Sequence, residues 1–280
     1  MHNPKTMTAA LFAMILGIVV YVRVLEPNLI KFTGQNDKPK TLNNSQAGNK
    51  TIKSFYQAKK KAHELYKGME TTFYCGCSFK DKVVNHHSCG FKPIQEDERS
   101  YRVEWEHVVP AYDFGRSFVS WRKGHPDCIN SKGKKYKGRK CARKASSKFK
   151  LMESDLYNLV PAIGEVNMRR SNLPMGILTG ESLSFGNCNT RIGAGMIEPR
   201  DQVKGFIART YQYMQHAYPG HGIISRKNTK LFEAWDRSYP PSSQEIKRAK
   251  RIFIIQGNSN PILSRKYSFK STVKQNADDV

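Results

Sequence analysis

The adjacent residues Glu106 and His107 have the clearest chemical potential in this sequence. They lie in a run of strand character, Arg102 to Val109, which Pro110 ends. Neighbouring side chains in a strand point to opposite faces, so the pair can act together only at a bulge or a strand end. There the carboxylate could hold a hard metal ion while the neutral imidazole takes a proton from water.

The balance of charge points to an anionic polymer as the partner. The chain has 280 residues, with 47 lysines and arginines, 23 acidic residues and a formal net charge of +24. Its 39% apolar and 11% aromatic content allows a buried core, which argues against disorder. The charge is densest at 132–150, and nucleic acid is favoured because basic grooves release phosphate counterions. A basic surface without a ligand and an anionic membrane surface are the alternatives.

The first 27 residues predict a signal peptide or a signal anchor. Residues 7–22 are almost wholly apolar and lie between Lys5 and Arg23, but they are short for a bilayer span of about 20 residues. No Ala-x-Ala cleavage site follows, so both fates stay open, and an uncleaved anchor is the only expected membrane contact. Either fate places the functional part outside the cytoplasm, so we expect a periplasmic or secreted protein, with anchoring to the inner membrane by residues 7–22 as the alternative. We expect a polar linker at 28–50, the functional domain at 51–265 and a flexible tail at 266–280.

The six cysteines favour disulfides, because their number is even and all of them follow the apolar leader. Zinc is the alternative for a cluster of Cys75, Cys77, His86, His87 and Cys89. Its Cys-x-Cys spacing, however, is tighter than the spacing of structural zinc sites. Six cysteines allow 15 pairings. In the expected arrangement Cys128 joins Cys141 across the basic loop, and the other four tie strands together: Cys75, Cys77, Cys89 and Cys188.

The predicted secondary structure is mixed and helix-rich, which indicates an α+β fold. Apolar periodicity predicts helices over 51–67, 150–160, 163–170, 203–215, 230–238 and 244–255. Strands are expected over 72–75, 79–84 and 101–109, and turns with short strands over 176–195. Residues 115–150 lack periodicity and are rich in Gly, Lys, Arg and Ser, so they are expected to form a basic loop.

Three segments, in this order, carry a family resemblance. They are Phe73-Tyr74-Cys75-Gly76-Cys77, Glu104-Trp105-Glu106-His107-Val108-Val109-Pro110 and Asp155-Leu156-Tyr157-Asn158-Leu159-Val160-Pro161-Ala162-Ile163-Gly164-Glu165-Val166-Asn167. Further matches are Arg170-Ser171-Asn172, Ile207 to Met214 and Ile255 to Pro261. Over about residues 52–263 the chain resembles the endonuclease I family of periplasmic and secreted bacterial nucleases.

That resemblance implies a ββα-metal core (a His-Me finger), in which a strand delivers the general base and a helix delivers a metal ligand. The matching base is His107, the matching metal ligands are Glu106 and Asn167, and the phosphate-clamping arginine aligns with Arg139. The basic loop is expected to supply further phosphate contacts, from Lys134, Lys135, Lys137, Lys140 and Arg143. The implied cofactor is Mg²⁺, with Mn²⁺ or Ca²⁺ as alternatives.

The implied activity is metal-dependent, sequence-nonspecific endonuclease hydrolysis of phosphodiester bonds in double- and single-stranded DNA, with RNA left open. The expected protein is a monomer without an obligatory protein partner. One departure motivates a second hypothesis, because Met168 and Arg169 replace the usual Gly and Asp after the matching asparagine. Loss of that carboxylate would suit a catalytically weakened, nuclease-derived nucleic-acid-binding module.

Three further polar residues are expected to have supporting roles. Asn158 lies among apolar neighbours and is read as a scaffold hydrogen bonder rather than a ligand. Glu153 and Glu165 are either carboxylates just outside the metal site or solvated helix residues.

Overall fold

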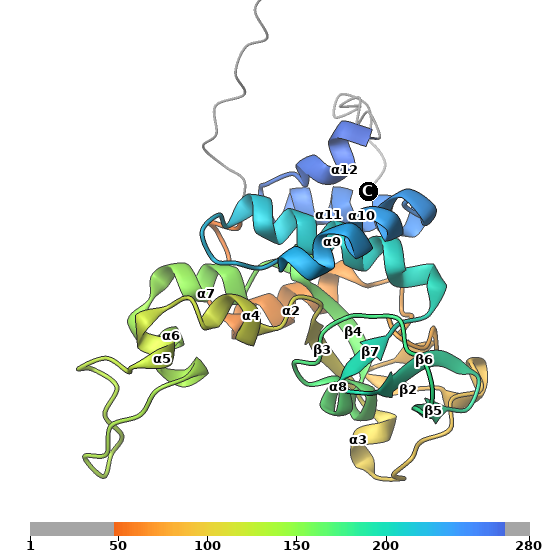
Figure 1. Cartoon of the computed structure of the whole chain (residues 1–280), viewed down its shortest axis with the longest axis horizontal. Coiled ribbons are helices and arrows are strands. Elements are labelled where there is room, and N and C mark those ends of the chain that lie inside the picture. The colour runs from red at the N-terminus through yellow and green to blue at the C-terminus, as the bar shows by residue number, and fades with distance from the viewer. Residues whose placement is uncertain (1–47, 267–280) are drawn as a thin grey trace, which may run out of the picture. The chain divides into compact units, whose positions relative to one another are not determined.

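The computed structural model describes residues 48–266, so the predicted leader, most of the 28–50 linker and the tail beyond residue 266 lie outside it. The described chain is a helix-rich mixture of helices and strands, which confirms the predicted α+β class (Figure 1). Between residues 48 and 266 no helix combines the length and apolar character that a bilayer span requires.

In the sequence, α-helices precede, separate and follow the short strands. They are α2 (Phe55–Leu65), α3 (Glu98–Tyr101), α4 (Ala111–Gly115), α5 (Val119–Arg122), α6 (Arg139–Ala145), α7 (Ser147–Glu153), α8 (Gly164–Arg170), α9 (Asp201–Ala217), α10 (Arg226–Ser238), α11 (Ser243–Gln256) and α12 (Pro261–Lys266). The strands are β1 (Phe79–Lys80), β2 (Val83–Val84), β3 (Val103–His107), β4 (Leu159–Ile163), β5 (Leu183–Phe185), β6 (Cys188–Gly193) and β7 (Met196–Glu198). Short 3-10 helices span His86–Ser88 and Leu156–Asn158.

Strands β3 and β4 and helix α8 form one supersecondary unit, here called the ββα unit. The two strands pair antiparallel, with Glu106 opposite Val160 and His107 opposite Leu159. Helix α8 begins directly after β4 and packs against both strands (Figure 1). Its first residue must be glycine, because a Cβ at Gly164 would lie 2.5 Å from the Arg99 carbonyl oxygen. This glycine lets α8 approach α3, the helix that precedes the strand with the acid–imidazole pair.

The prediction of a helix over 150–160 was wrong in its second half. Helix α7 ends at Glu153, and after a 3-10 turn the chain enters strand β4, in which every residue is buried. Pro161 lies inside this strand, opposite Trp105, although we expected it to stop a helix. The strand tolerates proline because, among the strands that the structure describes, β4 pairs with β3 alone and its other edge is not paired with a strand. Tertiary pairing has overridden the helical spacing of the local apolar residues.

The predicted strand over 72–75 and the predicted loop over 115–150 also need correction. Residues 73–75 form a turn, held by the hydrogen bond from Phe73 N to Pro161 O. The basic segment, defined here as residues 116–150, contains α5, α6 and the first part of α7, and only its middle is a loop. Its helices are short and pack against one another, which explains why no long apolar period marks them.

Among the C-terminal helices, α9 and α11 were predicted to within two residues of their ends, α10 begins four residues earlier than predicted, and α12 was not predicted. Helix α9 is buried along most of its length and contacts α10, α12 and the 3-10 turn before β4. Arg209 of α9 joins it to its neighbours by ion pairs to Asp236 of α10 and Glu245 of α11. Helix α11 ends at Gly257, whose φ of 87° is the left-handed conformation that favours glycine at a helix end. These helices support the ββα unit from one side (Figure 1).

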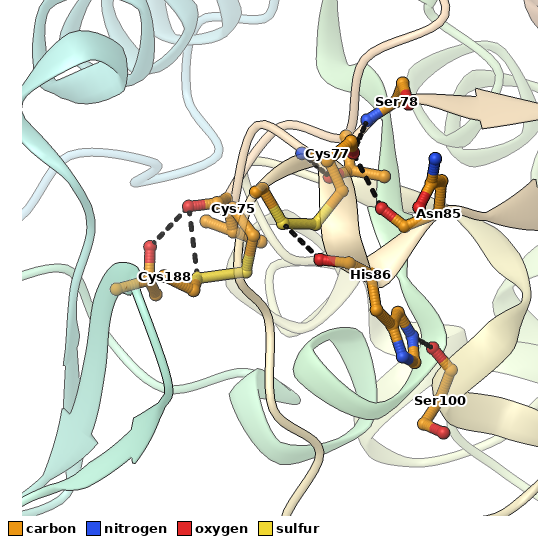
Figure 2. Close-up of a disulfide and its surroundings, with 12 residues drawn as sticks. Cys75, Cys77, Ser78, Asn85, His86, Ser100 and Cys188 are labelled. Carbon is orange, nitrogen blue, oxygen red and sulfur yellow. Dashed lines mark hydrogen bonds between the residues drawn. A yellow bond between two sulfur atoms is a disulfide. The ribbon is translucent and has the colours of Figure 1, made fainter.

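All six cysteines form disulfides, as predicted. The pairs are Cys75–Cys188, Cys77–Cys89 and Cys128–Cys141, so the bridge across the basic segment is also confirmed. Figure 2 shows His86 beside this network, with its ring directed at the Ser100 carbonyl oxygen at 2.8 Å. The zinc alternative is therefore wrong, because its cysteines are oxidised and His86 is used in packing. Within the described residues, no cluster of three His, Cys, Asp or Glu side chains could hold a metal.

Candidate active site

The residues proposed for catalysis meet at one open cavity of about 790 Å³. Glu106 and His107 reach it from the end of β3, Asn167 from α8 and Arg139 from the start of α6. Because the acid and the imidazole are the last two residues of the strand, both can serve the same cavity despite pointing in different directions. This geometry meets the condition set by the sequence for the pair to act together.

His107 is held as a neutral imidazole with one free nitrogen. Its Nε2 donates to the Glu153 carbonyl oxygen at 2.8 Å, and its ring lies 4.9 Å from that of Phe55. The side chain is buried, and burial together with the positive charge of Arg139 lowers the pKa of His107 to about 4. With Nε2 donating, Nδ1 keeps its lone pair at neutral pH and can accept a proton.

Glu106 is buried beside a cation that the sequence did not identify. Its Oε1 accepts hydrogen bonds from Tyr74 Oη at 3.1 Å and from Arg170 Nη1 at 2.5 Å. Burial nevertheless raises the pKa of Glu106 above its usual value. Neither donor uses Oε2, so this oxygen remains available to a ligand.

Arg170 is a functional residue that sequence reasoning missed. The fully buried guanidinium bonds to Glu106 and also donates to the carbonyl oxygens of His107 and Val108, at 2.7 and 2.6 Å. It therefore fixes both the carboxylate and the backbone that carries the imidazole. The signal was present in the Arg170-Ser171-Asn172 motif, but a motif match alone does not state what the arginine contacts.

Asn167 of α8 is oriented by Glu104, which lies on β3 together with Glu106. Its Nδ2 donates to Glu104 Oε2 at 2.7 Å, and Glu104 also accepts from Arg99 at 2.8 Å. Although burial opposes ionisation, hydrogen bonds from Arg99, Asn167 and Arg102 keep the pKa of Glu104 below its usual value. Because the amide nitrogen is committed to Glu104, the amide oxygen is left to face other ligands. Glu104 was named in the strand motif but was given no role there.

Glu153 binds two arginines through its carboxylate and the His107 imidazole through its backbone carbonyl oxygen. Its buried carboxylate accepts from Arg139 Nε at 2.5 Å and from Arg143 Nε at 2.6 Å. Burial opposes its ionisation, but the hydrogen bonds from Arg143 and the charge of Arg139 keep the pKa of Glu153 below its usual value. The Nη2 atom of Arg139 is buried and has no hydrogen-bond partner within the described residues. Glu153 is thus an ionised anchor and not a solvated helix residue.

Asn158 and Glu165 have structural roles. Asn158 Oδ1 accepts from Val109 N at 2.7 Å and its Nδ2 donates to Val109 O at 2.9 Å, which confirms the scaffold role. Glu165 is buried and accepts from the backbone nitrogens of Ile94 and Gln95. Arg169, one of the two departures from the family pattern, pairs with Glu165 at 2.9 Å. That arginine therefore does not insert its charge between Glu106 and Asn167.

The cavity carries an excess of positive charge. Its charged lining consists of two carboxylates, Glu104 and Glu106, and six cations: Lys59, Lys82, Arg99, Arg102, Arg139 and Arg170. Outside it, Lys134, Lys135, Lys137 and Lys140 are exposed on the basic segment, whereas Arg143 is bound to Glu153. This positive lining attracts a polyanion and repels an isolated cation. A metal ion here would therefore bind more tightly when phosphate oxygens of the substrate also coordinate it.

The donors on the two proposed metal ligands fit a hard divalent cation. Glu106 Oε2 and Asn167 Oδ1 are oxygen donors, and each belongs to a side chain whose other polar atom is already fixed by protein contacts. Two protein ligands suit Mg²⁺, which keeps several waters and takes phosphate oxygens in the remaining positions.

The class of protein is indicated by this architecture, because a ββα unit that presents an acid, an imidazole and an amide beside an arginine is the arrangement expected of a nuclease. The chain belongs to the endonuclease I family, whose pattern matches residues 29–266. It is 42% identical to Endonuclease-1 of Buchnera aphidicola subsp. Acyrthosiphon pisum over 217 residues, covering 75% of this chain and 80% of that protein.

Two proteins of Aeromonas hydrophila are also similar. This chain is 38% identical to an extracellular deoxyribonuclease over 222 residues, covering 76% of this chain and 89% of the relative. It is 37% identical to a periplasmic deoxyribonuclease over 220 residues, covering 76% of this chain and 86% of the relative. The predicted family and the predicted enzyme class, a phosphodiester-hydrolysing nuclease, are therefore confirmed.

Proposed function

We propose that this chain is an exported, divalent-metal-dependent, sequence-nonspecific endonuclease that hydrolyses DNA, with RNA as a further substrate to test. The observation that carries the proposal is the convergence of His107, Glu106, Asn167 and Arg139 on one cationic cavity. Export and DNA as the substrate are supported by relatives that are named extracellular and periplasmic deoxyribonucleases.

His107 is the proposed general base. Its Nδ1 takes a proton from water while the water oxygen bonds to phosphorus, and the bond from phosphorus to the leaving sugar oxygen breaks. The hydrogen bond from Nε2 to Glu153 O keeps Nδ1 unprotonated and holds the ring in place. Burial beside Arg139 ensures that the imidazole is neutral at physiological pH.

Glu106 and Asn167 are the proposed metal ligands, with Mg²⁺ as the first candidate and Mn²⁺ or Ca²⁺ as alternatives. A bound dication would neutralise charge on the phosphate and on the leaving oxygen. Arg139 is proposed to grip a phosphate oxygen, because its side chain lines the cavity and its Nη2 has no hydrogen-bond partner among residues 48–266. Grip on backbone phosphates carries no base identity, which accounts for cleavage without sequence preference.

A plasmid-nicking assay with Mg²⁺ on the oxidised protein tests the proposal. The expected result is rapid nicking that EDTA abolishes, and that Glu106→Ala or Asn167→Ala abolishes while DNA binding in EDTA survives. Tight binding without any nicking would instead support the weakened binding module suggested by Met168 and Arg169. Nicking that persists in EDTA would contradict the metal site.

A further inference from the structure

Two aromatic rings form a corner at one end of the catalytic cavity. Tyr112 of α4 and Trp121 of α5 both line the cavity, and their rings meet edge to face with centroids 6.2 Å apart. Tyr112 is 45% exposed, so part of its ring is accessible to a ligand. We call this pair the aromatic corner. The proposed hydrolysis does not use it.

The aromatic corner is built rigidly. The six-membered ring of Trp121 lies against the backbone of α4 at Gly115, where a Cβ would come within 2.3 Å of the ring. Beneath it the buried Phe149 ring lies 5.8 Å away. Gly115 is the last residue of α4, and any side chain there would collide with the indole, so the close approach of α4 and Trp121 depends on this glycine.

The corner is coupled to the proposed phosphate clamp. Gly138 N donates to Trp121 O at 3.0 Å, and the next residue, Arg139, begins α6 and directs its guanidinium to the cavity. The Arg116 guanidinium lies 5.9 Å from the centre of the Tyr112 ring. Over residues 116–150 the sequence has thirteen lysines and arginines and one acidic residue, Asp127. A ligand here must offer both a flat apolar face and negative charge on either side of it.

We propose that the aromatic corner is a nucleobase subsite, in which an unpaired base of the DNA strand stacks on Tyr112 and abuts Trp121 while Arg139 holds a neighbouring phosphate. The proposal rests on the proposed nuclease function. Every base has a stacking face, so the subsite adds affinity without sequence preference. It also favours single-stranded or locally opened DNA, because a base paired within a duplex cannot reach the rings.

Binding of a short single-stranded oligonucleotide in EDTA, measured by fluorescence anisotropy, tests the subsite without cleavage. Tyr112→Ala should weaken binding about tenfold, while Tyr112→Phe keeps most of the affinity because it keeps the ring. Tyr56→Ala is the matched control: Tyr56 is 64% exposed and has the Lys60 ammonium over its ring, but it does not line the cavity.

Two measurements distinguish base stacking from charge: the salt dependence of the affinity, and the affinity for an abasic oligonucleotide. Tyr112→Ala should leave the slope of log affinity against log salt unchanged, since no phosphate contact is lost. An oligonucleotide that lacks all of its bases should bind wild type more weakly than the normal oligonucleotide does. Tyr112→Ala should bind this abasic oligonucleotide as well as wild type does, because no base is left to stack. Equal losses for Tyr56→Ala and Tyr112→Ala, or the same loss from Tyr112→Ala on the abasic oligonucleotide as on the normal one, would overturn the proposal. So would failure of wild type to bind the oligonucleotide.

These outcomes are distinct from failure of the nuclease proposal. Persistent nicking by Glu106→Ala would remove the catalytic assignment but would leave the binding result intact. Normal catalysis with base-independent binding would remove the subsite alone.

Discussion

The ββα unit and the basic segment use their charges in opposite ways. In the ββα unit each charged side chain is tied to partners: Glu106 to Tyr74 and Arg170, and Glu104 to Arg99 and Asn167. On the basic segment the lysines of the central loop are exposed and make no ion pair within the described residues. Bond breaking needs fixed atoms, whereas attraction of a polyanion needs only local charge. The two regions meet at Glu153, which orients both His107 and Arg139.

The largest effect is expected from the imidazole. His107→Ala should lower the cleavage rate about 10²- to 10⁴-fold, because a positioned general base contributes roughly that much. Affinity for DNA in EDTA should hardly change, since the imidazole carries no charge there. His87→Ala, at an exposed histidine, is the control and should cleave normally. Cleavage by His107→Ala at the wild-type rate would rule out the assignment.

A buried arginine should matter for both stability and chemistry, and a matched pair separates the two. Arg170→Met and Arg209→Met each leave a buried carboxylate without its cation, which should cost about 3–5 kcal/mol in the free energy of unfolding. Urea unfolding measures this loss. Only Arg170→Met should also raise the Mg²⁺ concentration needed for cleavage, because Arg170 bonds to Glu106 and Arg209 does not. If both variants shift the metal requirement equally, Arg170 is purely structural.

The pH dependence should report the buried imidazole. With a folded pKa of about 4, His107 stays neutral as pH falls from 7 to about 5. Below that, cleavage should be lost first by protonation of Glu106, whose pKa burial raises above its usual value, and then by protonation of His107. The unfolded pKa is near 6.5, so between about 6.5 and 4 the unfolded chain binds more protons. Stability should therefore fall as pH drops through that window, by about 3 kcal/mol in total.

His107→Gln is the control for this titration. The difference in unfolding free energy between the variant and wild type should depend on pH only within the stated window. A difference that stays constant between about pH 4 and 6.5 would show that burial does not depress the His107 pKa.

The disulfides offer a way to perturb each region separately. Cys75–Cys188 (Figure 2) directly follows Tyr74 in the sequence, and Tyr74 holds Glu106. Cys128–Cys141, in contrast, anchors the loop of the basic segment to α6. Replacing either pair with serines should cost about 2–5 kcal/mol in stability. We expect the first double variant to lower kcat and the second chiefly to raise KM for DNA. Steady-state kinetics on both variants decides, and identical kinetic changes would contradict the division of roles.

The smallest effects are expected from single loop lysines. Lys134→Ala or Lys135→Ala should weaken DNA binding a few-fold and reduce the salt slope by about one, uniformly across sequences. Lys247→Ala on α11, also exposed but outside the basic segment, should leave the slope unchanged. Titrations between about 50 and 200 mM salt provide the measurement. An unchanged slope for both loop variants would place the phosphate path elsewhere.

Much of the fold was accessible from local pattern. Helices α2, α9, α10 and α11 follow their apolar periods, and α8 begins within one residue of the prediction. The failures share a cause: in β4 and in α6, short elements are stabilised by their neighbours and not by their own spacing. Pro161 was wrongly predicted to stop a helix. Proline is also compatible with a strand at an unpaired edge, and the pairing of β4 is known only from the tertiary structure.

The amino-acid sequence by itself determined the chemical groups of the site, their placement at a strand end and a helix, the family and the oxidised state of the cysteines. Only the tertiary structure decided which groups hold the reactive ones in place. Tyr74 and Arg170 meet Glu106 across 32 and 64 positions of sequence, and Glu153 meets His107 across 46. Periodicity reports which face of an element is buried, whereas a polar contact between distant segments exists only once the core has packed them together.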